Sequence, residues 1–444
     1  MKKISLSVSA LFMAALTGIS AFALVQSADS VSSYDVNKDG AVNSRDMLAE
    51  MKAVSENDTS SIYDIDSDGT VGSRDMTVLM KYIAAAPMAY TSENAESALT
   101  PEEEVRQLNI RHAEALSVIA DKLPGIVCWG DSLTSGPGGN AMSYPLALGN
   151  RVMQEITNTY DPLVSLSDEA KALVAADDYK ISVPVVNMGV GGETTYTILA
   201  RNGAIPFVTA SDITIPADKT PVSISLRSQD GHQVDPLLQG DAGMEYVTIS
   251  GVRGVITNTN GYKFTRSEAG ERVSVPAGTE VVTAGSENYR DYATVIYIGQ
   301  NNNRYGTSTN YKTTDSDYAD LVRQQRAIID HQTANNDKFV IVGLHMAEPR
   351  YRAALENYMQ AEYGDKFLNL RKYLCTSSME DAGLTPTQND IWRMQAGYAP
   401  FSLMTGDLLH FNSKGYELIG NLVYDKMEQL GYFDEVFTAL GISK

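Results

Sequence analysis

Cysteine is nearly absent from this sequence, because Cys128 and Cys375 are the only two and lie far apart along the chain. So few cysteines exclude a fold built on a disulfide framework. Cys128 lies in the apolar run 126–129, and free cysteine is among the most buried residue types. A buried free thiol is therefore favoured over a bridge, and neither cysteine is assigned a function.

Positive charge is also in the minority. The chain has 35 Lys and Arg against 55 Asp and Glu, which gives a net charge of -20 and a pI near 4.7. That charge repels nucleic acids and anionic membranes, so we expect neither as a partner and favour a neutral or sugar-like substrate. After the N-terminus no apolar run reaches the roughly 18 to 20 residues that a membrane span needs. With 43% hydrophobic residues among 444, the chain can still bury a sizeable core and hold more than one folded unit.

The N-terminus has the pattern of a secretory signal peptide. Lys2 and Lys3 precede an apolar run over about 6–16, and Ala21-Phe22-Ala23 forms a cleavage site of small residues. We therefore expect residues 1–23 to be removed and the mature protein to be soluble and extracellular.

A loop of calcium-binding type occurs twice, at 35–46 and 64–75, and each copy leads into an amphipathic stretch. Such a loop supplies oxygen ligands from positions 1, 3, 5, 7, 9 and 12 and has Gly at position 6 for a sharp turn. Position 7 acts through its carbonyl group, and a water replaces the missing side chain at Gly72. The expected ligands are Asp35, Asn37, Asp39, Ala41, Asn43 and Asp46 in the first loop, and Asp64, Asp66, Asp68, Thr70 and Asp75 in the second.

Both loops end in Asp, and no helix is expected before either one. A loop followed by one helix, repeated twice, resembles the type I dockerin module of cellulosomal enzymes over about 30–86. The resemblance implies a small α-helical domain with two structural Ca²⁺ ions that binds the cohesin of a scaffoldin, at the cell surface or in a cellulosome. In that family, loop positions 10 and 11 and the following helix contact the partner. The matching residues are Ser44, Arg45, Lys52, Ser73, Arg74 and Lys81.

Residues 87–100 are small and polar without hydrophobic periodicity, which indicates a linker. Thr100 and Pro101, followed by three acidic residues, then have the form of a helix start. The pattern predicts a helix that runs to Lys122.

Four short motifs carry chemistry. The buried-strand run 126–129 leads into Gly130-Asp131-Ser132-Leu133, strand 182–186 into Asn187-Met-Gly189-Val-Gly191-Gly192, strand 293–298 into Gly299-Gln300-Asn301-Asn302, and Asp407 precedes His410 by three residues. A serine at a strand-to-helix turn is exposed as a nucleophile, and glycine lets backbone donors approach a ligand. A carboxylate can fix the tautomer of a histidine that serves as base. Each motif alone could be an ordinary turn, but all four in this order indicate one active site.

These blocks resemble those of the SGNH hydrolases in the GDSL esterase and lipase superfamily, over about 104–440 apart from an insertion. The resemblance implies a three-layer αβα, flavodoxin-like domain with a parallel sheet, at 101–442. It implies Ser132 as nucleophile, His410 as base and Asp407 as the acid that orients it. The implied oxyanion donors are the Ser132 and Gly192 backbones and the Asn301 side chain, and catalysis needs no cofactor. Asn302 replaces the Asp that is common in the third block, which puts details around the site in doubt rather than activity.

The segment 203–289 departs from the alternating strand and helix pattern. It alternates at 222–226 and 246–250 and has an Asn260-Gly261 hairpin signal, so we predict an inserted β-rich subdomain. The insert could cap the active site, bind polysaccharide or brace the fold. His232 and His345 are interpreted as local structural groups or rim residues rather than catalysts.

The docking module points to a plant cell-wall polysaccharide such as acetylxylan, so the leading function is a secreted carbohydrate acetyl esterase that degrades polysaccharide. The family resemblance leaves a lipase, an arylesterase or a thioesterase open. A transesterase or a peptidoglycan-modifying esterase would share the same residues. A non-catalytic glycan-binding component of the assembly is the remaining alternative.

Overall fold

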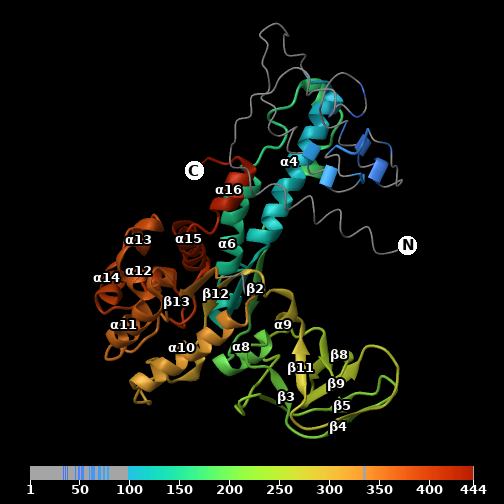
Figure 1. Ribbon diagram of the computed structural model, residues 1–444. Coiled ribbons are helices and arrows are strands. Elements are labelled where there is room, and N and C mark those ends of the chain that lie inside the picture. Colours follow the sequence, from blue (N-terminus) through green and yellow to red (C-terminus); the bar gives the residue numbers. More distant parts are fainter. Residues whose placement is uncertain are drawn as a thin grey trace. The chain divides into compact units, whose positions relative to one another are not determined.

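The computed structural model describes residues 99–333 and 337–443, together with scattered residues between Tyr34 and Leu79 (Figure 1). The chain divides into two compact units, Met1–Ala98 and Leu99–Lys444. The signal peptide and residues 80–98 of the predicted docking module and linker lie outside the described residues.

A five-stranded sheet forms the centre of the second unit, with the strand order β14-β13-β12-β1-β2. Every neighbouring pair in it is parallel. Strands β1 and β12 are buried along their whole length, as expected for a sheet covered on both faces. The strands are β1 Ile126–Gly130, β2 Val185–Gly189, β12 Ala293–Tyr297, β13 Phe339–Val342 and β14 Phe367–Leu368.

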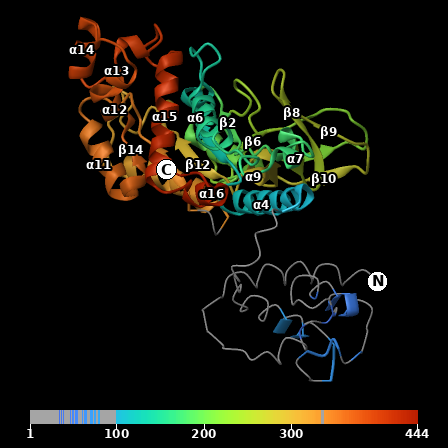
Figure 2. The same ribbon diagram turned by 90° about the horizontal axis from the view of Figure 1, so that it is seen from above.

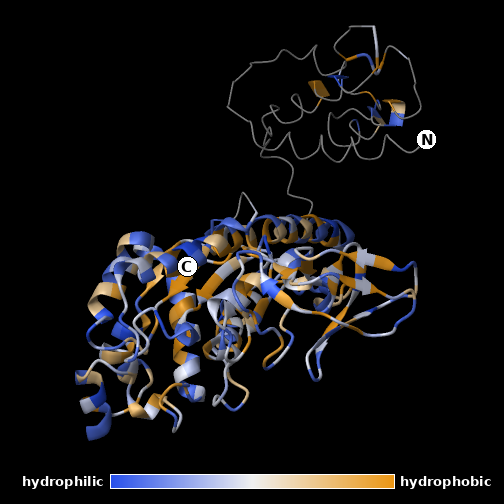
Figure 3. Cartoon of the chain, turned by 90° about the horizontal axis from the view of Figure 1, so that it is seen from below, coloured by the Kyte–Doolittle hydropathy of each residue, from blue (hydrophilic) through white to orange (hydrophobic). Residues whose placement is uncertain are grey.

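Helices cover the sheet on both sides. Helix α6 packs against α15, and α8 packs against α10; Figure 1 shows these two pairs on opposite sides of the strands. The sheet strands are coloured mainly as hydrophobic in Figure 3, whereas the helices around them alternate. The helices are α4 Pro101–Lys122, α5 Ser132–Ser135, α6 Tyr144–Val152, α7 Asp168–Lys171, α8 Thr195–Asn202, α9 Ala284–Asn288, α10 Asp315–Asp330, α11 Arg352–Tyr363, α12 Leu370–Thr376, α13 Ser378–Asp381, α14 Gln388–Gln395, α15 Ser413–Gln429 and α16 Asp434–Leu440, with short helical turns η2 Met153–Thr157, η3 Ala176–Tyr179, η4 Gln300–Asn302, η5 Gly364–Lys366 and η6 Phe401–Leu403.

The predicted α/β fold with a parallel sheet is confirmed, and so is the helix that follows the linker. Thr100 accepts a hydrogen bond from the Glu103 N–H and caps α4, which runs to Lys122. The strand predicted at 182–186 is shifted and instead covers Val185–Gly189. Proline has no N–H for the ladder, and Pro184 instead precedes the strand, where its carbonyl accepts from the Ile126 N–H.

The segment between α8 and α9 forms the predicted β-rich insert. Its seven-stranded sheet has the order β5-β9-β8-β7-β11-β3-β6, and β4 pairs separately with β10. Asn260 and Gly261 both have positive φ at the turn between β8 and β9, which confirms the hairpin. Figure 2 shows the insert at the opposite end of this unit from α11–α14. The strands are β3 Phe207–Thr209, β4 Ile213–Ile215, β5 Val222–Ser223, β6 Leu226–Ser228, β7 Val247–Ile249, β8 Val252–Asn258, β9 Tyr262–Arg266, β10 Val273–Val275 and β11 Glu280–Thr283.

The insert has its own hydrophobic core, which includes the fully buried Phe207 and Phe264. Helix α8 takes part in both cores, because Ile198 and Leu199 pack in the core of the parallel sheet and Ala200 packs in that of the insert. The insert is therefore joined to the hydrolase unit by packing as well as by its two chain connections.

Candidate active site

Ser132 lies where the central strand β1 turns into the short helix α5. Asp131 caps that helix, because its Oδ1 accepts a hydrogen bond from the Leu133 N–H at 2.9 Å. A side chain at Gly130 would collide with the Thr134 side chain, so the tight turn requires glycine there. The turn sets Ser132 at the carboxyl edge of the sheet, which is where open α/β sheets carry their sites.

A continuous hydrogen-bonded chain links Ser132, His410 and Asp407. His410 Nε2 lies 2.9 Å from Ser132 Oγ, and His410 Nδ1 lies 2.7 Å from Asp407 Oδ2. A carboxylate only accepts, so Nδ1 carries the hydrogen and Nε2 presents its lone pair to the serine hydroxyl. The arrangement is that of a serine nucleophile, a base and an orienting acid.

Asp407 is held by more donors than the histidine alone. Its Oδ1 accepts from the Thr405 hydroxyl at 2.5 Å and from the N–H groups of Leu409 at 2.9 Å and His410 at 3.0 Å. Burial opposes ionisation, but these hydrogen bonds and that of the His410 ring outweigh it and hold the pKa of Asp407 well below its usual range. Asp407 is therefore an ionised partner of His410 near neutral pH.

His345 supports the loop that carries His410. Its ring is fully buried, and its Nε2 donates to the Leu409 carbonyl at 3.1 Å while its Nδ1 accepts from the Tyr297 hydroxyl at 2.7 Å. Burial lowers the pKa of His345 to about 3, so the ring stays neutral and keeps this tautomer. His345 is thus a structural group rather than a rim residue.

Gly192 and Asn301 come from the two strands on either side of β1. Gly192 has a φ of +79°, and its N–H makes no hydrogen bond within the part of the chain that the structure describes. The Asn301 Nδ2 donates to the Glu193 carbonyl at 3.0 Å, so this amide lies beside residues 189–192, the glycine loop. A free backbone N–H and a side-chain amide at the same edge are the donor types of an oxyanion hole.

Asn302, where the resemblance leads one to expect Asp, orders the start of α8. Its Oδ1 accepts from the Thr195 N–H at 3.1 Å, and its Nδ2 donates to the Thr195 hydroxyl at 2.8 Å. An ionised Asp could accept the first bond but could not donate the second. The amide therefore fixes the helix that follows Gly192.

A buried ion pair lies behind the glycine loop. Arg201 and Glu193 are both fully buried with 2.7 Å between Arg201 Nη2 and Glu193 Oε2. Burial raises the pKa of Glu193, and the charge of Arg201 opposes that rise. Asp131 is also buried, and burial together with the charge of Glu193 raises its pKa to about 7.

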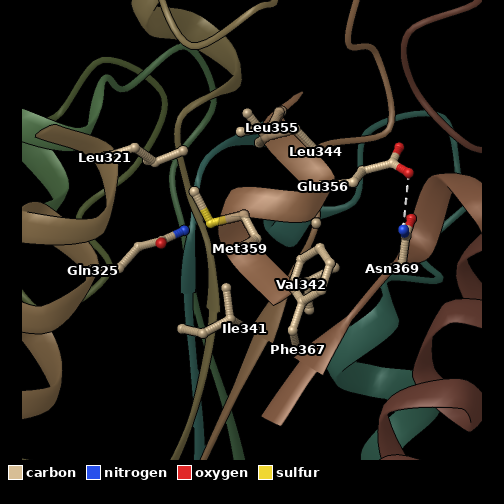
Figure 4. A pocket seen from close by; sticks show the side chains of 11 residues that line it. Leu321, Gln325, Ile341, Val342, Leu344, Leu355, Glu356, Met359, Phe367 and Asn369 are labelled. Atoms are coloured by element: carbon tan, nitrogen blue, oxygen red, sulfur yellow. Dashed lines mark hydrogen bonds between the residues drawn. The ribbon is translucent and has the colours of Figure 1, made fainter. Parts of the chain in front are cut away.

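Neither of two hollows found among the described residues belongs to this arrangement. One is a cavity of about 10 Å³ between α10, α11 and β13, lined by side chains that include Leu321, Met359 and Phe367 (Figure 4), which is barely room for a water molecule. The other is an open groove of about 650 Å³ on the insert beside Tyr246 and Arg253. None of Ser132, Asp407 and His410 lines either one.

The remaining sequence-predicted residues are a histidine, two cysteines and the residues of the docking module. His232 stacks on Tyr196 with the ring centres 3.9 Å apart, and it is His410 that lies beside Ser132. Cys128 and Cys375 are both free thiols, the first of them buried. Lys52 and Arg74 are exposed on the N-terminal unit. The following predicted ligands and partner-binding residues lie outside the described residues: Asp35, Asn37, Asp39, Ala41, Asn43, Ser44, Arg45, Asp66, Asp68, Ser73 and Lys81.

The described part of the second loop fits a calcium ion. Asp64 at position 1 accepts from the Gly69 N–H at 3.0 Å, and Gly69 at position 6 has a φ of +87°. The other oxygen of Asp64 is buried without a hydrogen-bond partner among the described residues. Asp75 at position 12 is 1% exposed and accepts from the Ile65 N–H at 2.7 Å. A buried carboxylate oxygen without a donor is the kind of ligand that Ca²⁺ takes.

The sequence patterns do not indicate Thr405, the Tyr297–His345 pair or the contact between the insert and the glycine loop. Thr405 precedes Asp407 by two residues, which is the one local signal available. The other two join segments that are far apart in the chain.

Comparison with the curated proteins and with the solved structures gives no match. Two family models do match. Residues 33–84 match the dockerin type I domain, and residues 126–423 match the GDSL-like lipase/acylhydrolase family. The second match spans β1 to α15 and includes all four motifs, so the chain belongs to the GDSL-like lipase/acylhydrolase family.

Proposed function

We propose that this protein is a secreted serine esterase that removes acetyl groups from a plant cell-wall polysaccharide such as acetylxylan. The observation that carries the proposal is the hydrogen-bonded chain from Ser132 through His410 to Asp407, with distances of 2.9 and 2.7 Å. Membership of an acylhydrolase family supports ester hydrolysis, and the dockerin match supports a cell-wall substrate.

In the first half of the reaction, Ser132 Oγ attacks the ester carbonyl while His410 Nε2 takes the hydroxyl proton. Asp407 stabilises the imidazolium that forms. The negative charge on the carbonyl oxygen is stabilised by the N–H groups of Ser132 and Gly192 and by the Asn301 amide. His410 then gives its proton to the alcohol oxygen as the bond to the acyl carbon breaks.

In the second half, water replaces the alcohol. His410 Nε2 takes a proton from the water as its oxygen attacks the acyl-enzyme, and the same donors hold the second oxyanion. Collapse of this intermediate returns the proton to Ser132 Oγ and releases the acid. The whole cycle uses only groups of this chain and water.

The docking arrangement is proposed with the boundaries of the sequence analysis, namely a signal peptide at 1–23, a dockerin at 30–86, a linker at 87–100 and the hydrolase at 101–442. The loops at 35–46 and 64–75 would hold two Ca²⁺ ions that stabilise the module, and Ser44, Arg45, Lys52, Ser73, Arg74 and Lys81 would contact a cohesin. No helix in the described part of the chain is long and apolar enough to cross a membrane.

The test is release of acetate from acetylated xylan, measured beside a series of 4-nitrophenyl esters of increasing acyl length. Ser132→Ala should lower kcat/KM by at least about 10³-fold. Ser211→Ala is the matched control, since Ser211 is exposed in the loop between β3 and β4. A preference for long acyl chains would replace the carbohydrate esterase with a lipase, and no Ser132-dependent hydrolysis of any ester would refute the proposed function.

A further inference from the structure

We propose that Leu238, on the insert, forms the end wall of the acyl-binding site and limits the length of the acyl group. The inference rests on the proposed function, because it takes Gly192 as an oxyanion donor. It assigns the insert a part in substrate selection at the site itself.

The turn that carries Leu238 lies between β6 and β7 and is fixed on both sides. Before the turn, the Asp235 N–H donates to the Thr197 hydroxyl of α8 at 3.1 Å, and the Pro236 carbonyl accepts from the Tyr262 hydroxyl at 3.0 Å. After the turn, the Ala242 carbonyl accepts from Arg201 Nη1 at 2.9 Å. The turn therefore has a set position relative to α8 and the glycine loop before it.

The tip of the turn lies directly on the glycine loop. A Cβ atom added to Gly192 would come within 2.6 Å of Leu238 Cδ2, and one added to Gly191 would collide with the Gln239 carboxamide. The two glycines thus leave space that is filled by side chains of the insert. No other residue of the insert has an atom within 4 Å of that added Cβ position.

Leu238 remains 51% exposed, although its neighbour Leu237 packs on the core of the insert. A substrate carbonyl oxygen bound by the Gly192 N–H would lie about 3 Å from that nitrogen. The carbon that bears it, and the acyl group attached to that carbon, would then come within van der Waals reach of the Leu238 side chain. An apolar side chain suits a short acyl group better than a hydroxyl-rich sugar, which would lose hydrogen bonds to water there.

A wall at this position discriminates by size. An acetyl group ends at its methyl carbon, whereas a butyryl group needs room for two further carbons. Each methylene that a pocket accepts or refuses changes kcat/KM by at least about tenfold. Shortening Leu238 should open the site to longer acyl groups, and enlarging it should close the site further.

The experiment measures kcat/KM for 4-nitrophenyl acetate and butyrate with the full-length protein. Leu238→Ala should raise the butyrate-to-acetate ratio by about tenfold or more, and Leu238→Phe should lower it. Leu173→Ala is the control, because Leu173 is 55% exposed, comparably to Leu238, and lies after α7. Its ratio should equal that of the unaltered protein.

The inference is overturned if both Leu238 variants hydrolyse acetate through Ser132 and keep the unaltered ratio within twofold. It is also overturned if Leu173→Ala shifts the ratio as much as Leu238→Ala does. Failure of the proposed function looks different, because then neither ester would be hydrolysed in a Ser132-dependent way by the unaltered protein.

Discussion

Replacing Asp407 by Asn should abolish most of the activity without unfolding the protein, because of how the two carboxylate oxygens are used. Oδ1 accepts from the Thr405 hydroxyl and from the N–H groups of Leu409 and His410, whereas Oδ2 accepts from the ring nitrogen of His410. The carbonyl oxygen of an Asn must take the first position, since an amide nitrogen there would meet three donors. Its NH₂ group would then point at His410 Nδ1.

An NH₂ group at that place forces the wrong tautomer on His410. Nδ1 becomes the acceptor, Nε2 carries the hydrogen, and the ring can no longer take the proton of Ser132. A carboxylate-to-amide change with this effect lowers kcat by about 10⁴, or about 5.4 kcal/mol in the activation free energy. The loop keeps the three hydrogen bonds to its carbonyl oxygen, so the change in melting temperature should be only a few degrees.

The assay is kcat/KM on 4-nitrophenyl acetate at neutral pH, with thermal unfolding followed on the same sample. Asp434→Asn is a suitable control, because Asp434 lies at the start of α16 and belongs to no part of the site. An Asp407→Asn protein that is fully folded and keeps more than about a tenth of the activity would refute the tautomer argument and with it the role given to Asp407.

Three further predictions concern stability. The pKa of His345 is lower in the folded chain than in the unfolded chain, so the unfolded state binds more protons. The free energy of unfolding should therefore fall as the pH drops from about 6.5 toward 3. Urea unfolding of His345→Gln should show a weaker dependence on acid pH. The pKa of Asp131 is raised to about 7 in the folded chain, so its contribution to the free energy of unfolding is lost as the pH rises from about 4 to 7. Asp131→Asn retains an N-cap acceptor and should not show this loss of stability. A pH profile of stability equal to that of the unaltered protein would contradict the prediction. Removing Ca²⁺ from the full-length protein with a chelator should lower the melting temperature of the N-terminal unit and leave esterase activity unchanged. In calorimetry, Asp64→Ala should reduce the rise in melting temperature that added Ca²⁺ produces.

The sequence predicts the parallel sheet, and it singles out the motifs whose Ser132, His410 and Asp407 side chains meet in the structure, because those signals are local. A buried apolar run followed by Gly-Asp-Ser-Leu is a strand with a turn, and a carboxylate three residues before a histidine can reach its ring. The error at 182–186 is local as well. The run of apolar residues there includes Pro184, which cannot donate in the ladder, so the strand begins after it, at Val185, and ends at Gly189 within the motif.

The groups that hold the site in place could not be predicted in this way. His345 follows β13 and meets the Leu409 carbonyl 64 residues later, and Tyr297 ends β12. No periodicity or spacing brings those three positions together. The position of Leu238 could not be predicted either, because the sequence shows only an apolar residue in an irregular stretch. Its contact with Gly192 arises from the fold.

The proposed effect of the insert on the acyl site has a structural basis in helix α8. The helix starts just after the glycine loop, where Asn302 bonds to Thr195, and it contributes Leu199 to one core and Ala200 to the other. Arg201 then joins Glu193, next to Gly192, to the Ala242 carbonyl beyond the turn of the insert. The glycine loop and the turn that carries Leu238 are therefore fixed to the same two helical turns. Because they share one support, we expect a change in the side chains of the insert turn to alter the space over Gly192. Ser132 and His410 depend on β1 and on the loop before α15, so we expect them to keep their positions.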